Sequence, residues 1–300
     1  MTRNMRILIG MDASPAASYI VDEAVSRPWP AESEFCVVHV VDEHQFGPFP
    51  KLVTDAKREG ERLINTASDR LSQAGRKSQA KIALGNPRKR ISALAKRWKA
   101  DLVMVGAHGQ GVIARFLMGS VAQDTLRFAS CSVEIVRPSP SGKPASSHAM
   151  KILLATDGSE CSIAAAKSIA QQPWPSGSQI RILSAGELPV FPYPADGSSL
   201  SPVYPAGLLQ ELVASARKRA SEAVEAAREI LVAAGLEPFE NQPTPLGNAR
   251  ALILEVAKEW QADLIVLGSH GRRGLDRLIM GSVSESVAIY AHCSVEIVRS

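Results

Sequence analysis

Two glycine-rich stretches with one shared spacing are the residues best suited to chemistry in this sequence. The first is Gly106–Gly109 (GAHG), followed after nine residues by Gly119–Val121 (GSV). The second is Gly268–Gly271 (GSHG), followed after nine residues by Gly281–Val283 (GSV). Glycines let a backbone approach a bulky anion closely, and the first turn of a helix offers unpaired N–H groups and a partial positive charge. The pattern therefore favours a phosphate-binding loop in each copy.

A purely structural explanation of the same residues stays open. The glycines would then only shape turns, and Ser120 and Ser282 would only cap the helices that follow, since serine is a common N-cap residue. A short glycine pattern matches many unrelated sequences by chance. Two copies with identical spacing favour a binding site over turns alone.

Each copy also carries a histidine, His108 or His270, which is a candidate general base. Neither motif holds a carboxylate that would orient the ring, and no lysine follows the glycines as it does in a P-loop. The cysteines and histidines show none of the spacings typical of metal sites. We therefore expect no catalytic residue and no metal site built by the protein.

The elements that must position these loops follow from the apolar pattern. Each loop comes directly after a continuous apolar run, 102–105 or 264–267, which is typical of a central strand buried on both faces. Strands are predicted at Arg6–Met11, Glu34–Val41, Ser78–Leu84, Leu102–Val105 and Ser132–Arg137, and again at Lys151–Thr156, Gln179–Ser184, Glu237–Thr244, Leu264–Leu267 and Ser294–Arg299. Helices are predicted at Pro15–Ser26, Leu52–Ala74, Pro87–Trp98, Gly119–Ala129 and Ala206–Ala234. This alternation indicates an α/β fold with doubly wound parallel sheets.

The chain contains an internal repeat. Besides the glycine motifs, Arg6–Asp12 aligns with Lys151–Asp157 and Pro28–Pro30 (PWP) aligns with Pro173–Pro175 (PWP). The second copy is longer, and its extra residues fall in the proline-rich segment Leu188–Pro205, which we expect to be a surface loop. We therefore expect two domains, residues 1–138 and 149–300, joined by a linker at 139–148.

Asp12 and Asp157 follow the first strand of each half. In a doubly wound sheet, ligands bind beyond the carboxyl ends of the strands, where the direction of winding switches. If the first and fourth strands are neighbours, each aspartate faces a glycine loop across one crevice. A carboxylate there suits ribose hydroxyls or base N–H donors. The alternative is that each aspartate caps the following helix.

Composition is that of an ordinary globular protein. Of 300 residues, 45% are apolar and 21% are charged, and the nearly balanced charge of +4 does not indicate nucleic-acid binding. We expect no signal peptide and no membrane span, because no apolar run has the required form or length. The four cysteines, whose spacing forms no disulfide framework, are Cys36, Cys131, Cys161 and Cys293. Free thiols and a cytoplasmic location are the expectation, and a disulfide is the less favoured alternative.

The G-x2-G-x9-G-S motif, the aspartate after the first strand and the Ala-Asp-Leu before the fourth together resemble the universal stress protein family. The resemblance covers nearly all of both halves, so the chain resembles a tandem member of the branch with an ATP-binding motif. It implies a Rossmann-like, five-stranded parallel sheet of order 3-2-1-4-5 in each domain, and ATP, alone or with Mg²⁺, as the ligand. The residues that would contact ATP are Asp12, Val40, Gly106, His108, Gly109, Gly119, Ser120 and Val121 in the first domain and Asp157, Gly268, His270, Gly271, Gly281, Ser282 and Val283 in the second.

The last strand of each repeat departs from the family pattern. It has serine where family members often have proline, and it contains a glutamate, Glu134 or Glu296, which is costly to bury unpaired. In the family this strand commonly forms the dimer contact. We hypothesise that the two last strands meet at an internal pseudo-twofold axis, with the glutamates near Arg137 and Arg299. The alternative is an edge strand whose glutamate faces water, and two chains could also pair as a homodimer.

Three functions follow from the resemblance and the motifs. The first is a stress-response regulatory protein whose conformation or partner choice depends on ATP, with little or no turnover. The second is a weak ATPase or a self-phosphorylating protein in which Ser120 or Ser282 lies near the γ-phosphate. The third is an interaction scaffold that binds no nucleotide. Because only the second loop carries Arg272 and Arg273, we expect the second site to hold a triphosphate more tightly.

Overall fold

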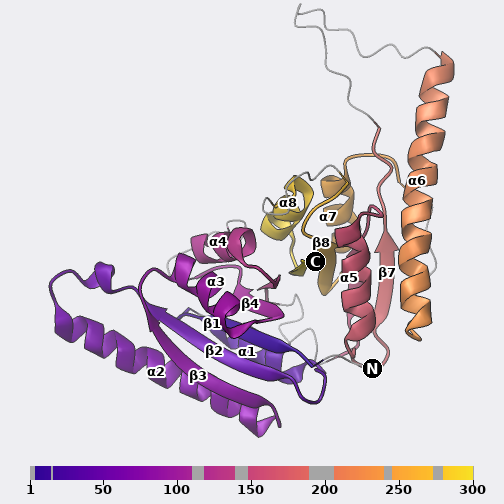
Figure 1. Ribbon diagram of the computed structural model, residues 1–300. Helices are drawn as coiled ribbons and strands as arrows, with labels where there is room; N and C mark the ends of the chain where they lie inside the picture. The colour runs from indigo at the N-terminus through magenta and orange to yellow at the C-terminus, as the bar shows by residue number, and fades with distance from the viewer. Residues whose placement is uncertain are drawn as a thin grey trace, which may run out of the picture.

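The computed structural model describes residues 4–14, 16–109, 118–138, 148–188, 206–239, 245–272 and 280–299. Its strands are β1 (Arg6–Met11), β2 (Glu34–Val41), β3 (Lys77–Leu84), β4 (Leu102–Gly106) and β5 (Ser132–Val136) in the first half, and β6 (Lys151–Ala155), β7 (Gln179–Leu183), β8 (Leu264–Gly268) and β9 (Ser294–Val298) in the second. They form one sheet in the order β3-β2-β1-β4-β5-β9-β8-β6-β7, so the two halves share a sheet (Figure 1). The predicted linker lies outside the described residues except for His148, and the predicted surface loop lies outside them from residue 189 onward.

The strand order of the first half is the predicted 3-2-1-4-5, and the strands within each half pair in parallel. The second half differs at its outer edge. Of the predicted strand over 237–244, residues 240–244 lie outside the described residues. The described residues on either side of this gap form two isolated parallel bridges, Ile180↔Pro238 and Gly186↔Leu246. Proline supplies no N–H to a ladder, so Pro238 can only accept hydrogen bonds there.

Helices cover both faces of the sheet (Figure 1). One face carries α3 (Pro87–Trp98), α4 (Ser120–Phe128), α7 (Ala249–Glu259) and α8 (Ser282–Tyr290), and the other carries α1 (Ala16–Ser26), α2 (Pro50–Gln73), α5 (Glu160–Gln171) and α6 (Ala206–Ala233). On the first face a single apolar core runs through both halves and includes Val133, Ile135, Val295 and Ile297 of the two central strands. On the other face two separate cores lie under α1 with α2 and under α5 with α6. The shared core joins the two domains into one folded unit.

Helix α6 spans almost the predicted range and buries one face. Its buried residues, spaced as on one face of a helix, are Ala216, Ala220, Ala223, Val224, Ala227 and Leu231. Leu209 continues this spacing toward the start of the helix but is 40% exposed. Figure 1 shows the reason, because this end of α6 extends past the strands that would cover it.

The described helices and the cysteines bear on membrane insertion and on disulfide formation. No helix in the described ranges is long and apolar enough to cross a membrane. The four cysteines are free thiols. Burial raises the pKa of the Cys131 and Cys293 thiols to about 12, which makes both thiols poor nucleophiles.

Strands β5 and β9 join the two halves as an antiparallel pair in which Glu134 lies opposite Glu296. The hypothesis that the last strands meet is therefore confirmed, but the expected partners of the glutamates are wrong. Arg137 instead donates to the carbonyl of Ala288 at 2.6 Å, and Arg299 donates to that of Leu126 at 2.6 Å. Side chains alternate along a strand, so an arginine three residues after a glutamate points to the opposite face of the sheet.

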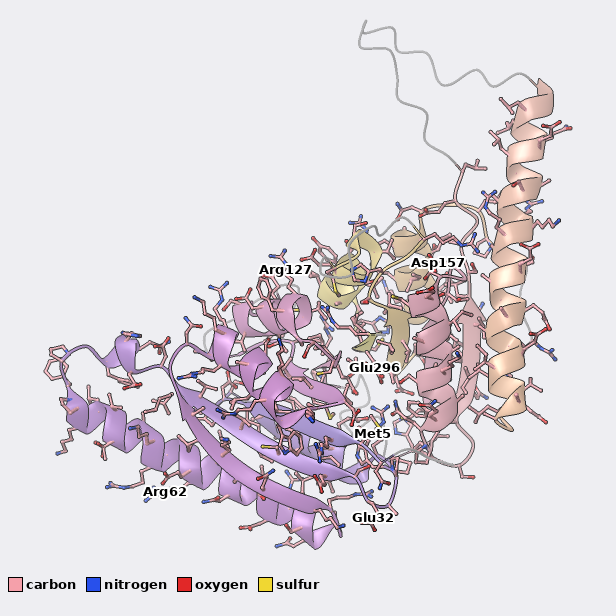
Figure 2. All side chains as sticks on the ribbon, viewed as in Figure 1. Met5, Glu32, Arg62, Arg127, Asp157 and Glu296 are labelled. Carbon is pink, nitrogen blue, oxygen red and sulfur yellow. The ribbon has the colours of Figure 1, made fainter. Side chains whose placement is uncertain are left out.

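The two glutamates meet Arg27, which follows α1 and is completely buried. One guanidinium nitrogen of Arg27 donates to Glu134 at 2.8 Å, and the other donates to Gln172 at 2.6 Å and lies 3.5 Å from Glu296. Trp29 and Trp174 stack on the guanidinium, each with its ring centroid 4.6 Å away. We call this cluster the seam. Figure 2 shows Glu296 in the middle of the molecule, where the two halves meet.

The seam holds more carboxyl groups than cations. Burial raises the pKa of Glu134 to about 7, and the neighbouring Glu296 and Glu23 add to this effect while Arg27 opposes it. Burial alone would lower the pKa of Arg27, but the surrounding carboxylates outweigh it and raise that pKa. Near neutral pH, Glu134 is therefore protonated in part of the molecules, and Arg27 stays charged.

Candidate functional site

Each half contains a cavity beyond the carboxyl ends of its central strands. The first cavity has a volume of 560 Å³ and lies beyond β1 and β4, and the second has a volume of 730 Å³ and lies beyond β6 and β8. The predicted contact residues that line the first cavity are Asp12, Val40, Gly106, His108, Gly109, Gly119, Ser120 and Val121. Those that line the second are Asp157, Gly268, His270, Gly271, Gly281, Ser282 and Val283. The structure thus brings together residues from distant parts of each repeat, while their contact with a ligand stays a prediction.

Each aspartate sits directly on the glycine loop of its own half. A Cβ atom added to Gly109 would lie 2.7 Å from a carboxylate oxygen of Asp12, and one added to Gly271 would lie 2.6 Å from Asp157. This close approach requires glycine, because real Cβ atoms do not come so near another atom. Figure 2 places Asp157 at the end of the second domain where α6 extends past the sheet.

Asp157 is held by backbone donors on both sides of the crevice. It accepts hydrogen bonds from the N–H of Ser159 at 3.0 Å and from the N–H of Arg272 at 2.9 Å. Burial disfavours the charged carboxylate, but these bonds outweigh burial and hold the pKa of Asp157 below its usual value. The N-cap of α5 is Ser159, so the alternative that Asp157 caps this helix is wrong.

The glycine after each loop begins a helix. Gly119 and Gly281 are the N-cap residues of α4 and α8, and each donates its N–H back to the loop at 2.8 Å. Ser120 and Ser282 are exposed first-turn residues, so the interpretation that they are N-caps is wrong. The first backbone N–H groups of both helices therefore face the cavities without a side-chain cap.

The two histidines differ in their surroundings. His270 Nδ1 lies 2.9 Å from the hydroxyl oxygen of Ser269, a residue that has no hydroxyl counterpart in the first repeat, where Ala107 stands. Burial and the nearby charge of Arg299 lower the pKa of His270, so the neutral ring is favoured at neutral pH. Among the described residues, His108 Nδ1 and His270 Nε2 have no hydrogen-bond partner. Both of these nitrogens are buried, so the described structure gives neither of them a partner in the protein or contact with solvent.

Sequence reasoning missed the helix that forms one wall of each cavity. Helix α2 contributes Ala56, Glu59, Gly60 and Leu63 to the first cavity, and α6 contributes Ala216, Arg219 and Ala220 to the second. Small residues four positions apart, Ala56 with Gly60 and Ala216 with Ala220, were a usable signal, because they leave room beside a helix.

The first cavity has further lining residues, after β2, that were also missed. The 3-10 helix η1 (Glu43–Phe46) follows β2 and places Gln45 and Phe46 on the cavity wall, beside Asp42 and His39. His39 is oriented by a contact of 2.9 Å between its Nδ1 and the carbonyl oxygen of Met11. The corresponding part of the second repeat lies mostly outside the described residues.

Comparison with known proteins decides the family. A model described as the universal stress protein family matches residues 3–137 and 149–299, which is nearly the whole chain. The chain belongs to the universal stress protein family. The matched ranges correspond to the two halves of the sheet, so this universal stress protein contains two tandem family domains.

Relatives of this universal stress protein are distant in sequence but similar in fold. A putative universal stress protein of Staphylococcus aureus (strain USA300) is 29% identical over 137 residues, which is 44% of this chain and 82% of the relative. The crystal structure of a universal stress protein from Archaeoglobus fulgidus DSM 4304 is 18% identical, covers 98% of this chain and 96% of its own, and has a TM-score of 0.66. A putative universal stress protein from Pseudomonas aeruginosa UCBPP-PA14 is 18% identical, covers 99% and 93%, and has a TM-score of 0.58. These structures show the two-domain fold alone.

Proposed function

We propose that this universal stress protein is a cytoplasmic, ATP-binding regulatory protein of the stress response, with one potential nucleotide site in each domain. The observation that carries the proposal is the duplicated cavity. In both halves an aspartate packs on a glycine loop, and the following glycine begins a helix whose first N–H groups face the same cavity. The arrangement is present in both halves of the repeat, which turn geometry alone does not require.

The parts of each cavity suit different parts of a nucleotide. Helix N-termini and glycine backbones attract phosphate oxygens, so the triphosphate would lie at Gly119 or Gly281. The carboxylates of Asp12 and Asp157 would accept hydrogen bonds from ribose hydroxyls, and Val40 would lie beside the base. Mg²⁺ would be held by the phosphates and water, which is a common way for proteins to bind this ion.

The site offers a candidate base but no complete catalytic set. His270 is favoured in its neutral form and contacts a serine hydroxyl, which orients the ring. Its other ring nitrogen has no hydrogen-bond partner among the described residues, so no carboxylate completes a catalytic arrangement there. Ser120 and Ser282 are exposed at the cavity walls, so transfer of the γ-phosphate to either would make the protein self-phosphorylating. We propose that binding itself is the signal, through a change in conformation or in the choice of partner.

Calorimetric titration of Mg-ATP into the full chain tests the proposal. Gly119→Val and Gly281→Val would fill the expected phosphate positions with backbone angles that valine adopts, since φ is −63° and −67° at these residues. Gly207→Val is the matched control, because a Cβ at Gly207 meets no atom within 4 Å.

We expect micromolar binding of Mg-ATP that is lost with Gly281→Val, weaker binding that is lost with Gly119→Val, and no change with the control. Absence of binding in every form would favour an interaction scaffold and overturn the proposal. Release of inorganic phosphate, or labelling of Ser120 or Ser282 by the γ-phosphate, would instead favour the weak enzyme.

A further inference from the structure

The helical walls of the two cavities carry opposite charges at equivalent positions. Helices α2 and α6 are each followed by a glycine with positive φ, Gly75 at 75° and Gly235 at 79°. Counting back equally far from these glycines places Glu59 of α2 at the same position as Arg219 of α6. Both residues are exposed and line the cavity of their own domain. A carboxylate in the first cavity is therefore replaced by a guanidinium in the second.

The other charged residues strengthen this difference. Besides Glu59, whose carboxylate lies 3.5 Å from the exposed guanidinium of Arg62, the described walls of the first cavity carry Asp12 and Asp42 and no lysine or arginine. The described walls of the second cavity carry two acids, Asp157 and Glu187, and two arginines, Arg219 and Arg272. The charged residues on the described walls therefore give the first cavity a negative net charge and the second cavity a net charge of zero.

The two arginines of the second cavity lie at different levels along α6. A Cβ added to Gly158 would lie 2.7 Å from the Arg272 guanidinium and 3.3 Å from Ala223 of α6, so Arg272 extends to the inner face of this helix. Arg219 lies one helical turn before Ala223 and donates to the hydroxyl of Ser215 at 2.5 Å, so its guanidinium is directed toward the preceding turn of α6. Guanidinium groups at two levels of one wall suit a ligand that carries several phosphate groups.

The first cavity is better suited to a base than to a chain of phosphates. Its described walls include the aromatic ring of Phe46 and the imidazole of His39, on which a base can stack. In the described walls of the second cavity there is no Phe, Tyr or Trp. The acidic wall of the first cavity would accept hydrogen bonds from hydroxyl and amino groups and repel additional phosphates.

We propose that the two domains bind different classes of nucleotide, with nucleoside di- or triphosphates in the second and a nucleoside or nucleoside monophosphate in the first. Glu59 and Arg219 are the residues that set this difference. The inference rests on the proposed function, because it divides the same two sites between ligands of different charge. The full chain would thereby report on two ligands at once.

Each site can be measured alone in the full chain with the other cavity filled. In the Gly281→Val background we expect AMP and adenosine to bind the first cavity at least tenfold more tightly than Mg-ATP. Adding Glu59→Arg should reverse that order. In the Gly119→Val background we expect Mg-ATP to be preferred, and adding Arg219→Glu should weaken it about tenfold, which is the effect of one charge-assisted contact, while adenosine binding stays the same.

Matched controls separate a local contact from a change in net charge. Glu61→Arg and Arg217→Glu alter exposed residues of the same helices that do not line the cavities, and they change the net charge by the same amounts. We expect neither control to alter the preference for AMP or Mg-ATP.

The outcomes distinguish this inference from the proposed function. If both isolated sites rank Mg-ATP and AMP in the same order, or if the controls act as strongly as the cavity variants, the division between domains is overturned while nucleotide binding stands. If no adenine ligand binds any form, the proposed function fails and this inference fails with it.

Discussion

The seam and the two cavities both contain residues that differ between the two repeats, but the consequences differ. In the seam, Arg27 of the first half contacts Gln172, its own counterpart in the repeat, so two unlike residues fill one shared cluster. In the cavities, Glu59 and Arg219 also differ, but each acts in a separate site. Differences at a shared axis must complement one another, whereas differences in separate sites are independent. We therefore expect substitutions in the seam to be strongly coupled and substitutions in the cavities to be additive.

The largest effect should come from removing the cation of the seam. Arg27→Gln leaves Glu134 and Glu296 buried without a counter-charge, which costs about 3–5 kcal/mol when a buried pair loses one partner. Urea or thermal unfolding measures this loss. The control is Arg127→Gln, which removes an exposed ion pair with Glu285 and should cost no more than about 1 kcal/mol.

Exchanging the residues at positions 27 and 172 tests the coupling within the seam. The double variant Arg27→Gln with Gln172→Arg moves the cation to the other side of the axis, where it faces the same two glutamates. We expect it to recover most of the stability lost by Arg27→Gln, because the two positions fill one cluster. A double variant as unstable as the single one would contradict the coupling.

The second effect is a dependence of stability on pH. The pKa of Glu134 is raised from 4.5 to about 7, so the folded state binds a proton that the unfolded chain releases. This contribution is complete below the ordinary glutamate pKa and is lost as pH rises through about 7, for a total of roughly 3 kcal/mol. The unfolding free energy of the wild type minus that of Glu134→Gln should decline as pH rises from 4 to 8. A difference that stays constant over this range would refute the assignment.

The smallest effect tests independence of the cavities. A methyl group at Gly281 would lie 3.1 Å from the Ser269 carbonyl, whereas one at Gly119 would lie no closer than 3.5 Å to any neighbour. We expect Gly281→Ala to cost about 1 kcal/mol and Gly119→Ala to be nearly neutral. Unfolding of the double variant should show the sum of the two changes, and a marked departure from that sum would mean that the cavities are coupled.

The repeat made much of the fold predictable. The apolar runs and the glycine spacing, present in both halves, predicted the strands and the loops at each crevice. The strand order of the first half and the meeting of the last strands came from the resemblance to the family. The edge of the second half was less predictable, because Pro238 supplies no N–H to a ladder and the described residues there form only isolated bridges. Leu209 fitted the helical period but had no part of the sheet to cover it.

The seam could not be predicted from the sequence, for a different reason. Arg27 lies 107 residues from Glu134 and 145 from Gln172, and its counterpart is a different residue type, so the repeat offered no matched pair to notice. Glu59 and Arg219 were overlooked because charged residues on exposed helix surfaces are common. Their equivalence became visible once the structure placed both residues on cavity walls, at the same distance from the glycine that follows each helix.

The contact between Arg27 and Gln172 bears on how such a chain could arise by fusion of two copies. In a symmetric pair of identical domains, a residue on the axis faces its own image, and an arginine there would meet a second arginine. Joining the copies in one chain lets a mutation alter one side and leave the other unchanged. A chain that carries both copies can therefore place one guanidinium against two glutamates, a combination that a strictly symmetric pair of identical subunits cannot form.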